Sequence, residues 1–183
     1  MRTSEADILI VPGLGGSGAD HWQSRWDAKL PTARLILQDS FDRPVLSEWR
    51  ERLIEEILRA ERPVVLVGHS LGSLAIAHAA PHLRDSGVKG AFLVAPPAPD
   101  VVATLSSIDP AFAASPMEPL PFPSLIIASR DDPYSSYAES ERLAGSLGAE
   151  LVDAGNSGHI NADSGHGPWP EGLMRFAGFL KNL

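Results

Sequence analysis

Cysteine is absent from this chain of 183 residues. Its absence excludes disulfides, thiolate zinc sites, iron–sulfur clusters and cysteine nucleophiles, and it suits a protein of a reducing compartment. Any nucleophilic chemistry must therefore come from another side chain.

Positive charge is also scarce. Lys and Arg number 15 against 23 Asp and Glu, which gives a formal net charge of -8 and a pI near 5.1. Binding to nucleic acid phosphates needs clustered Lys and Arg, and here these residues are scattered along the chain. We expect no nucleic-acid partner, and small or neutral substrates are favoured.

Long hydrophobic runs are missing as well. No segment reaches the roughly 20 apolar residues of a membrane span. The first residues, MRTSEADILIVPG, lack the basic start and long apolar core of a signal peptide. We therefore expect a soluble, cytoplasmic protein without a membrane partner, folded as one domain over residues 1–183. The sequence does not indicate an oligomeric state.

Short apolar segments alternate with helical patterns. Residues 8–11 form a β-branched and leucine run that stops at Pro12-Gly13, which is typical of a strand buried on both faces of a parallel sheet. Similar segments predict strands at 33–37, 63–67, 90–95, 124–128 and 150–152. Helical patterns predict helices at 21–30, 46–60, 71–83, 137–147 and 170–183. The alternation predicts an α/β fold, a doubly wound, mostly parallel sheet of about six strands with helices on both faces.

The segment 46–60 shows the helical period well, because Trp49, Leu53 and Ile57 fall on one stripe. Ser47 is its expected N-cap.

Residues 96–123 break the alternation. This segment carries eight of the sixteen prolines and only a short possible helix around 101–105. A connection of this length inside a compact domain is usually functional, often as a lid or a wall of a site. The alternative is an irregular excursion that only closes the surface.

The pentapeptide Gly68-His69-Ser70-Leu71-Gly72 carries the strongest chemical signal. It directly follows the apolar segment VVLV and precedes the helix-forming SLAIAHAA, which is the strand-turn-helix context of a nucleophile elbow. Ser70 would then lie at the carboxyl end of the sheet and at a helix N-terminus, where negative charge is stabilised.

A serine nucleophile needs a general base, and in this fold the triad follows the chain order Ser, acid, His. His159 lies in a glycine-rich loop, Gly155-Asn156-Ser157-Gly158-His159, between the last strand and the last helix. That loop reaches the edge of the sheet where the elbow lies. His166 is the alternative on the same loop. His78 and His82, one turn apart, lack the Glu of an HExxH motif, so we predict no metal site.

The acid is expected just after the strand 124–128, where Ser129-Arg130-Asp131-Asp132-Pro133 follows. Neighbouring side chains of an extended segment point to opposite sides, so only one aspartate can face the base. Asp132 is preferred because the following proline restricts its backbone, and Asp131 is more naturally a turn residue.

A second glycine-rich loop, Pro12-Gly13-Leu14-Gly15-Gly16, follows the first strand. It has neither the Lys-Ser/Thr ending of a P-loop nor a full GxGxxG pattern, which weakens the alternative of a nucleotide-binding protein. In a hydrolase such a loop supplies one oxyanion donor, here the N–H of Leu14. The residue after the nucleophile, Leu71, supplies the other.

Several motifs occur together in order: VPGLGG followed by HWQSRW, then GHSLG, ASRDDPY and GHINADSGHGPWPEG. With them, nearly the whole chain resembles the small serine hydrolases typified by retinoblastoma-binding protein 9 and its bacterial relatives. The resemblance implies a minimal α/β-hydrolase fold and a triad of Ser70, Asp132 and His159. It also implies that His21, Trp22 and Trp169 lie near the substrate. The LxCxE motif behind that protein's name cannot be present, since this chain has no cysteine.

These observations predict a serine hydrolase that cleaves a carboxylic ester of a small acyl substrate, with thioesters and amides as the less favoured bonds. No metal or organic cofactor is expected. The alternative is a catalytically weak binding or regulatory module that retains the fold, which fold alone never excludes.

Overall fold

A computed structural model describes residues 1–114 and 118–183. Its sheet has the order β2-β1-β3-β4-β5-β6, and every neighbouring pair is parallel. The strands are β1 (Asp7–Val11), β2 (Ala33–Leu35), β3 (Val64–His69), β4 (Val88–Val94), β5 (Ser124–Ala128) and β6 (Glu150–Asp153). The helices are α1 (Trp22–Lys29), α2 (Leu46–Leu58), α3 (Leu71–Ala79), α4 (Pro99–Thr104), α5 (Tyr137–Leu147) and α6 (Pro170–Asn182).

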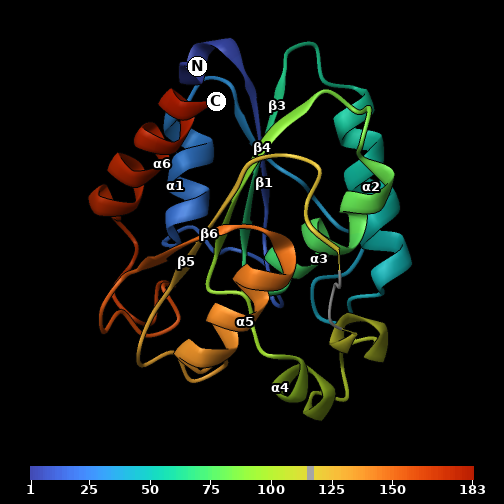
Figure 1. The fold of residues 1–183 in the computed structure, drawn as a ribbon, viewed down its shortest axis with the longest axis vertical. Coiled ribbons are helices and arrows are strands. Elements are labelled where there is room, and N and C mark those ends of the chain that lie inside the picture. Colours follow the sequence, from blue (N-terminus) through green and yellow to red (C-terminus); the bar gives the residue numbers. More distant parts are fainter. Residues whose placement is uncertain (115–117) are drawn as a thin grey trace.

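Both faces of the sheet are covered, which confirms the doubly wound α/β prediction. Successive side chains of a strand point to opposite faces. In β1, Ile8 and Ile10 pack into the core beneath α1 and α6, whereas Leu9 and Val11 pack into the core beneath α2, α3 and α5. Figure 1 shows α1 and α6 on one side of the sheet and α2 and α3 on the other. Residues 8–11 are buried on both faces of the sheet, which explains their continuous apolar run.

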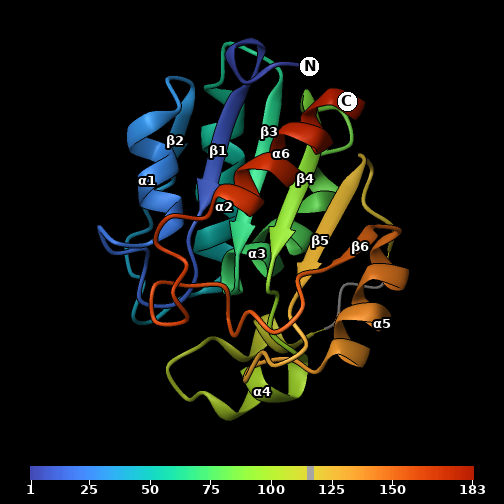
Figure 2. The ribbon, with the colours of Figure 1, turned by 90° about the vertical axis from the view of Figure 1, so that its left-hand side faces the viewer.

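The strand order places a topological switch point between β1 and β3. The chain leaves β1 for β2 on one side and returns to form β3 on the other. In open α/β sheets, ligands bind outside the carboxyl ends of the strands at such a point. Figure 2 shows the arrowheads of β1, β3, β4 and β5 pointing toward the end of the molecule where α4 lies. The loops that carry the predicted site residues gather at this edge.

The proline-rich segment covers that edge through α4 and a short 3-10 turn, Pro110–Ala113. Backbone hydrogen bonds fix it at several points: the N–H of Ala98 donates to Tyr134 O, and that of Leu120 to Leu147 O, each at 2.9 Å. Residues 115–117 of the predicted segment 96–123 lie outside the described residues.

Two local predictions are wrong in detail. β2 ends at Leu35, and Leu37, predicted inside the strand, is 71% exposed. Ser47 does not cap α2, because the helix already begins at Leu46. The cap comes from the proline-rich segment, where the carboxylate of Asp109 accepts the Leu46 N–H at 3.0 Å. No helix in the described part of the chain is both long and apolar enough to cross a membrane.

Candidate active site

Ser70 lies on the turn between β3 and α3, with φ 52° and ψ -124°. A non-glycine residue rarely adopts a positive φ, so the turn holds Ser70 in a strained conformation. The flanking glycines make the turn possible. A Cβ on Gly68 would lie 2.8 Å from the backbone of Ser73, and a Cβ on Gly72 would clash with the carbonyl of Val11. The sequence pattern and the geometry of a nucleophile elbow therefore coincide here.

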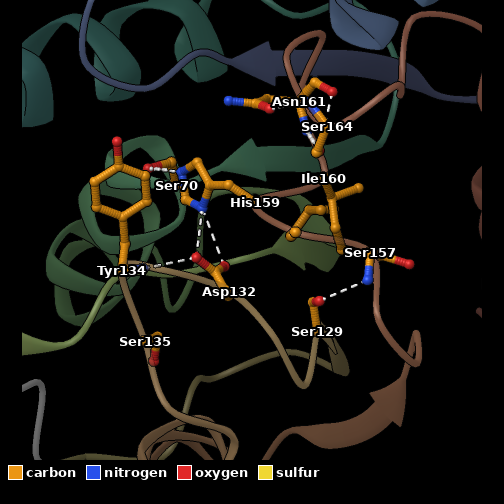
Figure 3. A network of polar contacts seen from close by, with 12 residues as sticks. Ser70, Ser129, Asp132, Tyr134, Ser135, Ser157, His159, Ile160, Asn161 and Ser164 are labelled. Atoms are coloured by element: carbon orange, nitrogen blue, oxygen red, sulfur yellow. Dashed lines mark hydrogen bonds and ion pairs between the residues drawn. The ribbon is translucent and has the colours of Figure 1, made fainter.

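His159 connects Ser70 to Asp132 (Figure 3). Its Nε2 lies 2.9 Å from Ser70 Oγ, and its Nδ1 lies 3.0 Å from each carboxylate oxygen of Asp132. The Tyr134 N–H also donates to Asp132 Oδ1, at 2.9 Å. The side chains of His159 and Asp132 are 9% and 3% exposed, so bulk water competes little for these contacts. His166 takes no part, since its Nδ1 contacts Ser164 Oγ instead.

The two adjacent aspartates point in different directions. The carboxylate of Asp131 accepts hydrogen bonds from Ser129 Oγ and from the Gly158 N–H, both at 2.7 Å. These two hydrogen bonds, the one from Ser129 first, lower the pKa of Asp131. Ser129 Oγ in turn accepts the Ser157 N–H at 2.9 Å. Asp131 is thus more than the predicted turn residue, because it holds the backbone directly before His159.

Two buried donors hold the other side of the same loop. His69 Nε2–H donates to the carbonyl of His159, and the Trp22 indole N–H donates to the carbonyl of Ile160, each at 2.9 Å. Ile160 is fully buried with φ 47°. Burial lowers the pKa of His69 well below its usual value, so this imidazole is neutral. Sequence reasoning missed both roles, which depend on backbone carbonyls far along the chain.

Trp22 and Trp169 do not line the cavity at Ser70, contrary to what the resemblance implied. Their rings pack 4.9 Å apart in the core between the sheet and helices α1 and α6. Trp26, Phe92 and Phe176 complete this aromatic cluster. Large rings fill the space between these elements, so both tryptophans stabilise the core behind the site instead of facing substrate.

A cavity of about 230 Å³ opens above Ser70. One stretch of the proline-rich segment provides five of the apolar residues that line it: Pro97, Val101, Val102, Leu105 and Ile108. This stretch is therefore a wall of the site. Among the described residues that line the cavity, none is Asp, Glu, Lys or Arg. Within residues 1–114 and 118–183, no three His, Asp or Glu side chains gather as a metal site requires.

Three further polar side chains line the cavity: His21, Tyr134 and Asn161. Of the three residues predicted near substrate, His21 does line the cavity. Burial, together with the nearby His159 and His166, lowers the pKa of His21 to about 4. Tyr134, which sequence reasoning did not single out, also lines the cavity, and its ring lies edge-on to His159 at 4.5 Å.

The loop after β1 lies directly against the elbow. A Cβ on Gly13 would be 3.0 Å from Ser70 Cβ and 3.1 Å from the carbonyl of His69, so only glycine fits without a shift. Leu14 and Leu71, the predicted oxyanion donors, both line the cavity. Across the described residues, neither of their backbone N–H groups has a protein acceptor. Both amides are thus available to a ligand beside Ser70.

Comparison with known proteins gives a consistent result. A family model described as "Serine hydrolase" matches residues 8–178. A YdeN-like hydrolase from Pectobacterium atrosepticum is 36% identical, with 97% of this chain and 91% of that chain covered and a TM-score of 0.84.

More distant structures share the fold. The ydeN gene product of B. subtilis is 22% identical, with 97% of this chain and 99% of that chain covered and a TM-score of 0.75. Esterase 2 of Thermogutta terrifontis is 14% identical, with 97% and 83% covered and a TM-score of 0.70. A search of curated proteins found no match. The narrower resemblance to retinoblastoma-binding protein 9 stays a prediction.

Proposed function

This chain belongs to the serine hydrolase family, and we propose that it hydrolyses small carboxylic esters through an acyl-enzyme formed on Ser70. His159 is the general base and Asp132 orients it. The observation that carries the proposal is the unbroken line of contacts from Ser70 Oγ through His159 to Asp132, with Ser70 and His159 lining one cavity.

The tautomer of His159 follows from its partners. An ionised carboxylate only accepts hydrogen bonds, so Asp132 keeps a hydrogen on His159 Nδ1 and leaves a lone pair on Nε2. That lone pair faces Ser70 Oγ at 2.9 Å and takes its proton as the oxygen attacks the acyl carbon. The carboxylate then stabilises the imidazolium. The N–H groups of Leu14 and Leu71 bind the negative oxygen of the tetrahedral intermediate.

The second half returns the proton and releases the acid. When the intermediate collapses, His159 Nε2–H protonates the departing alcohol oxygen and the acyl group stays on Ser70. Water then attacks the acyl carbon while His159 accepts one of its protons. Collapse of this second intermediate frees the carboxylic acid and returns the proton to Ser70 Oγ. These steps use only side chains, backbone amides and water.

The cavity favours short esters. An apolar cavity of about 150 Å³ accommodates benzene, so about 230 Å³ holds roughly nine or ten non-hydrogen atoms. We expect turnover of p-nitrophenyl esters to be highest for acetate to hexanoate and to fall steeply for dodecanoate and longer chains.

Labelling with a fluorophosphonate probe tests the proposal directly. An activated serine reacts with this probe, whereas the serine of a catalytically inert binding module does not. We expect stoichiometric labelling of the wild type and none of Ser70→Ala, with loss of ester hydrolysis in the same variant. Ser47→Ala is the matched control, since Ser47 is an exposed serine on α2. Activity of Ser70→Ala within tenfold of wild type would refute the assignment.

A further inference from the structure

Two polar side chains of the cavity offer it hydrogen-bond donors only. The first is His21, the N-cap of α1, whose Nδ1 accepts the Gln23 N–H at 3.1 Å. Nδ1 therefore carries a lone pair. Burial keeps this imidazole neutral at pH 7, so its single hydrogen is on Nε2.

The second donor is Asn161. Its Oδ1 accepts the Ser164 N–H at 3.0 Å, which fixes the orientation of the amide, because only the oxygen can accept. The amide nitrogen then lies on the side away from Ser164 (Figure 3). Within the described parts of the chain, no protein acceptor takes the His21 Nε2–H or the Asn161 NH₂ hydrogens. Both residues line the cavity.

Both donors line the same cavity as Ser70 and His159. Asn161 follows His159 by two residues on the same loop. The His69 ring contacts His21 at 4.7 Å and His159 at 4.9 Å between ring centroids, so the three imidazoles form one cluster. His159 delivers the proton to the leaving alcohol. We therefore place the alcohol in the part of the cavity that these two donors share with His159.

The absence of charged side chains among the described lining residues restricts the class of ligand that the cavity can bind. None of the described lining residues is Asp, Glu, Lys or Arg. The cavity therefore offers no opposite charge to a phosphate or carboxylate group of a ligand. An unpaired donor in a partly buried site favours a ligand that supplies an acceptor. The stretch 97–108 offers apolar contacts only and suits the acyl chain.

We propose that His21 and Asn161 select esters whose alcohol part carries a neutral oxygen acceptor, such as the ether or hydroxyl oxygen of a short polyol or alkoxy alcohol. This inference rests on the proposed ester hydrolysis at Ser70. It makes the two residues determinants of leaving-group specificity, while the apolar wall contacts the acyl chain.

A pair of matched esters tests the proposal. In 2-methoxyethyl butyrate an ether oxygen replaces one CH₂ group of n-butyl butyrate, and the number of non-hydrogen atoms is unchanged. The ether also makes the alcohol a slightly better leaving group. The decisive quantity is therefore the ratio of kcat/KM for 2-methoxyethyl butyrate to kcat/KM for n-butyl butyrate, and how much each variant changes this ratio.

We expect His21→Phe and Asn161→Asp each to lower this ratio by about threefold to tenfold, as for loss of one hydrogen bond. Asn161→Asp keeps the acceptor for the Ser164 N–H, and any effect of its charge on His159 acts on both esters and cancels in the ratio. Asn156→Asp makes the same chemical change at an exposed position of the same loop and should leave the ratio unchanged.

The outcomes separate this inference from the proposed function. Ratios within twofold of wild type in both folded variants would overturn the selection of an acceptor oxygen, while loss of hydrolysis in Ser70→Ala would still support the catalytic assignment. Hydrolysis of both esters by Ser70→Ala at the wild-type rate would overturn the proposed function itself. If His21→Phe does not fold because α1 loses its N-cap, the Asn161→Asp ratio decides.

Discussion

Replacing Asp132 by Asn tests the proposed mechanism most sharply, because it changes one atom and removes one charge. In the native site both carboxylate oxygens lie 3.0 Å from His159 Nδ1, and one of them also accepts the Tyr134 N–H. The amide oxygen of Asn can keep the Tyr134 contact. Its NH₂ group then faces Nδ1 and favours a lone pair there, which moves the imidazole hydrogen to Nε2. In that tautomer His159 cannot accept the proton of Ser70.

The expected loss in kcat is about 10⁴-fold, the size typical of a wrong tautomer in a serine triad. It corresponds to about 5.5 kcal/mol of transition-state stabilisation. The assay is kcat and KM for p-nitrophenyl butyrate, normalised to folded protein, and the loss should fall on kcat because Asp132 does not line the cavity.

Asp131→Asn is the matched control. The same exchange at the neighbouring position leaves an amide oxygen that still accepts from Ser129 and from the Gly158 N–H. We expect activity within tenfold of wild type. The reasoning is refuted if Asp132→Asn also stays within tenfold, or if the severe loss occurs in Asp131→Asn instead.

Three further predictions concern the histidines and the loop after β1. His159→Ala should lower kcat by several orders of magnitude and His166→Ala only mildly, and steady-state kinetics showing the reverse ranking would transfer the role of base. In the unfolded chain His21 becomes protonated below about pH 6.5, but in the native state only near pH 4. The free energy of unfolding should therefore decrease by up to about 3 kcal/mol as the pH is lowered from 6.5 to 4. Urea unfolding at pH 7 and pH 4.5 should show a smaller decrease in the free energy of unfolding for His21→Asn than for wild type. An equal decrease would contradict the lowered pKa of His21. Gly13→Val should reduce fluorophosphonate labelling at least tenfold in folded protein, because its side chain would meet Ser70 and the His69 carbonyl; unchanged labelling would argue against the close approach.

Much of the fold follows from short-range patterns. The apolar segments are three to six residues long and mostly end at proline, glycine or a polar turn, so their order predicts the parallel sheet. Contacts between distant segments were not predictable. The acceptor for the first N–H of α2 is such a case, since Asp109 and Leu46 lie far apart in sequence and a local search selects Ser47 as a cap instead. β2 ends early for a similar reason, because Leu37 has no covering element.

The candidate site divides along the same line. Ser70, His159 and Asp132 each follow a strand, in the chain order of the fold. The proline after Asp132 and the glycine-rich loop before His159 favour them over Asp131 and His166. The groups that hold His159 in place are harder to recognise in the sequence. His69 is part of the elbow motif, but its partner is a backbone carbonyl, which no sequence pattern reveals. The resemblance placed Trp22 near substrate. Trp22 lies behind the site, where its indole N–H binds the backbone of the His159 loop, and it does not line the cavity.

The apolar wall has a consequence for how such an enzyme can diversify. Its residues belong to one continuous stretch, 97–108, whereas the proposed triad comes from three separate loops after β3, β5 and β6. The stretch is fastened at its ends, by the Ala98 N–H to Tyr134 and by the Asp109 carboxylate to α2. Substitutions confined to the stretch between these two anchors can therefore change the acyl preference. The strands that align nucleophile, base and acid need not change.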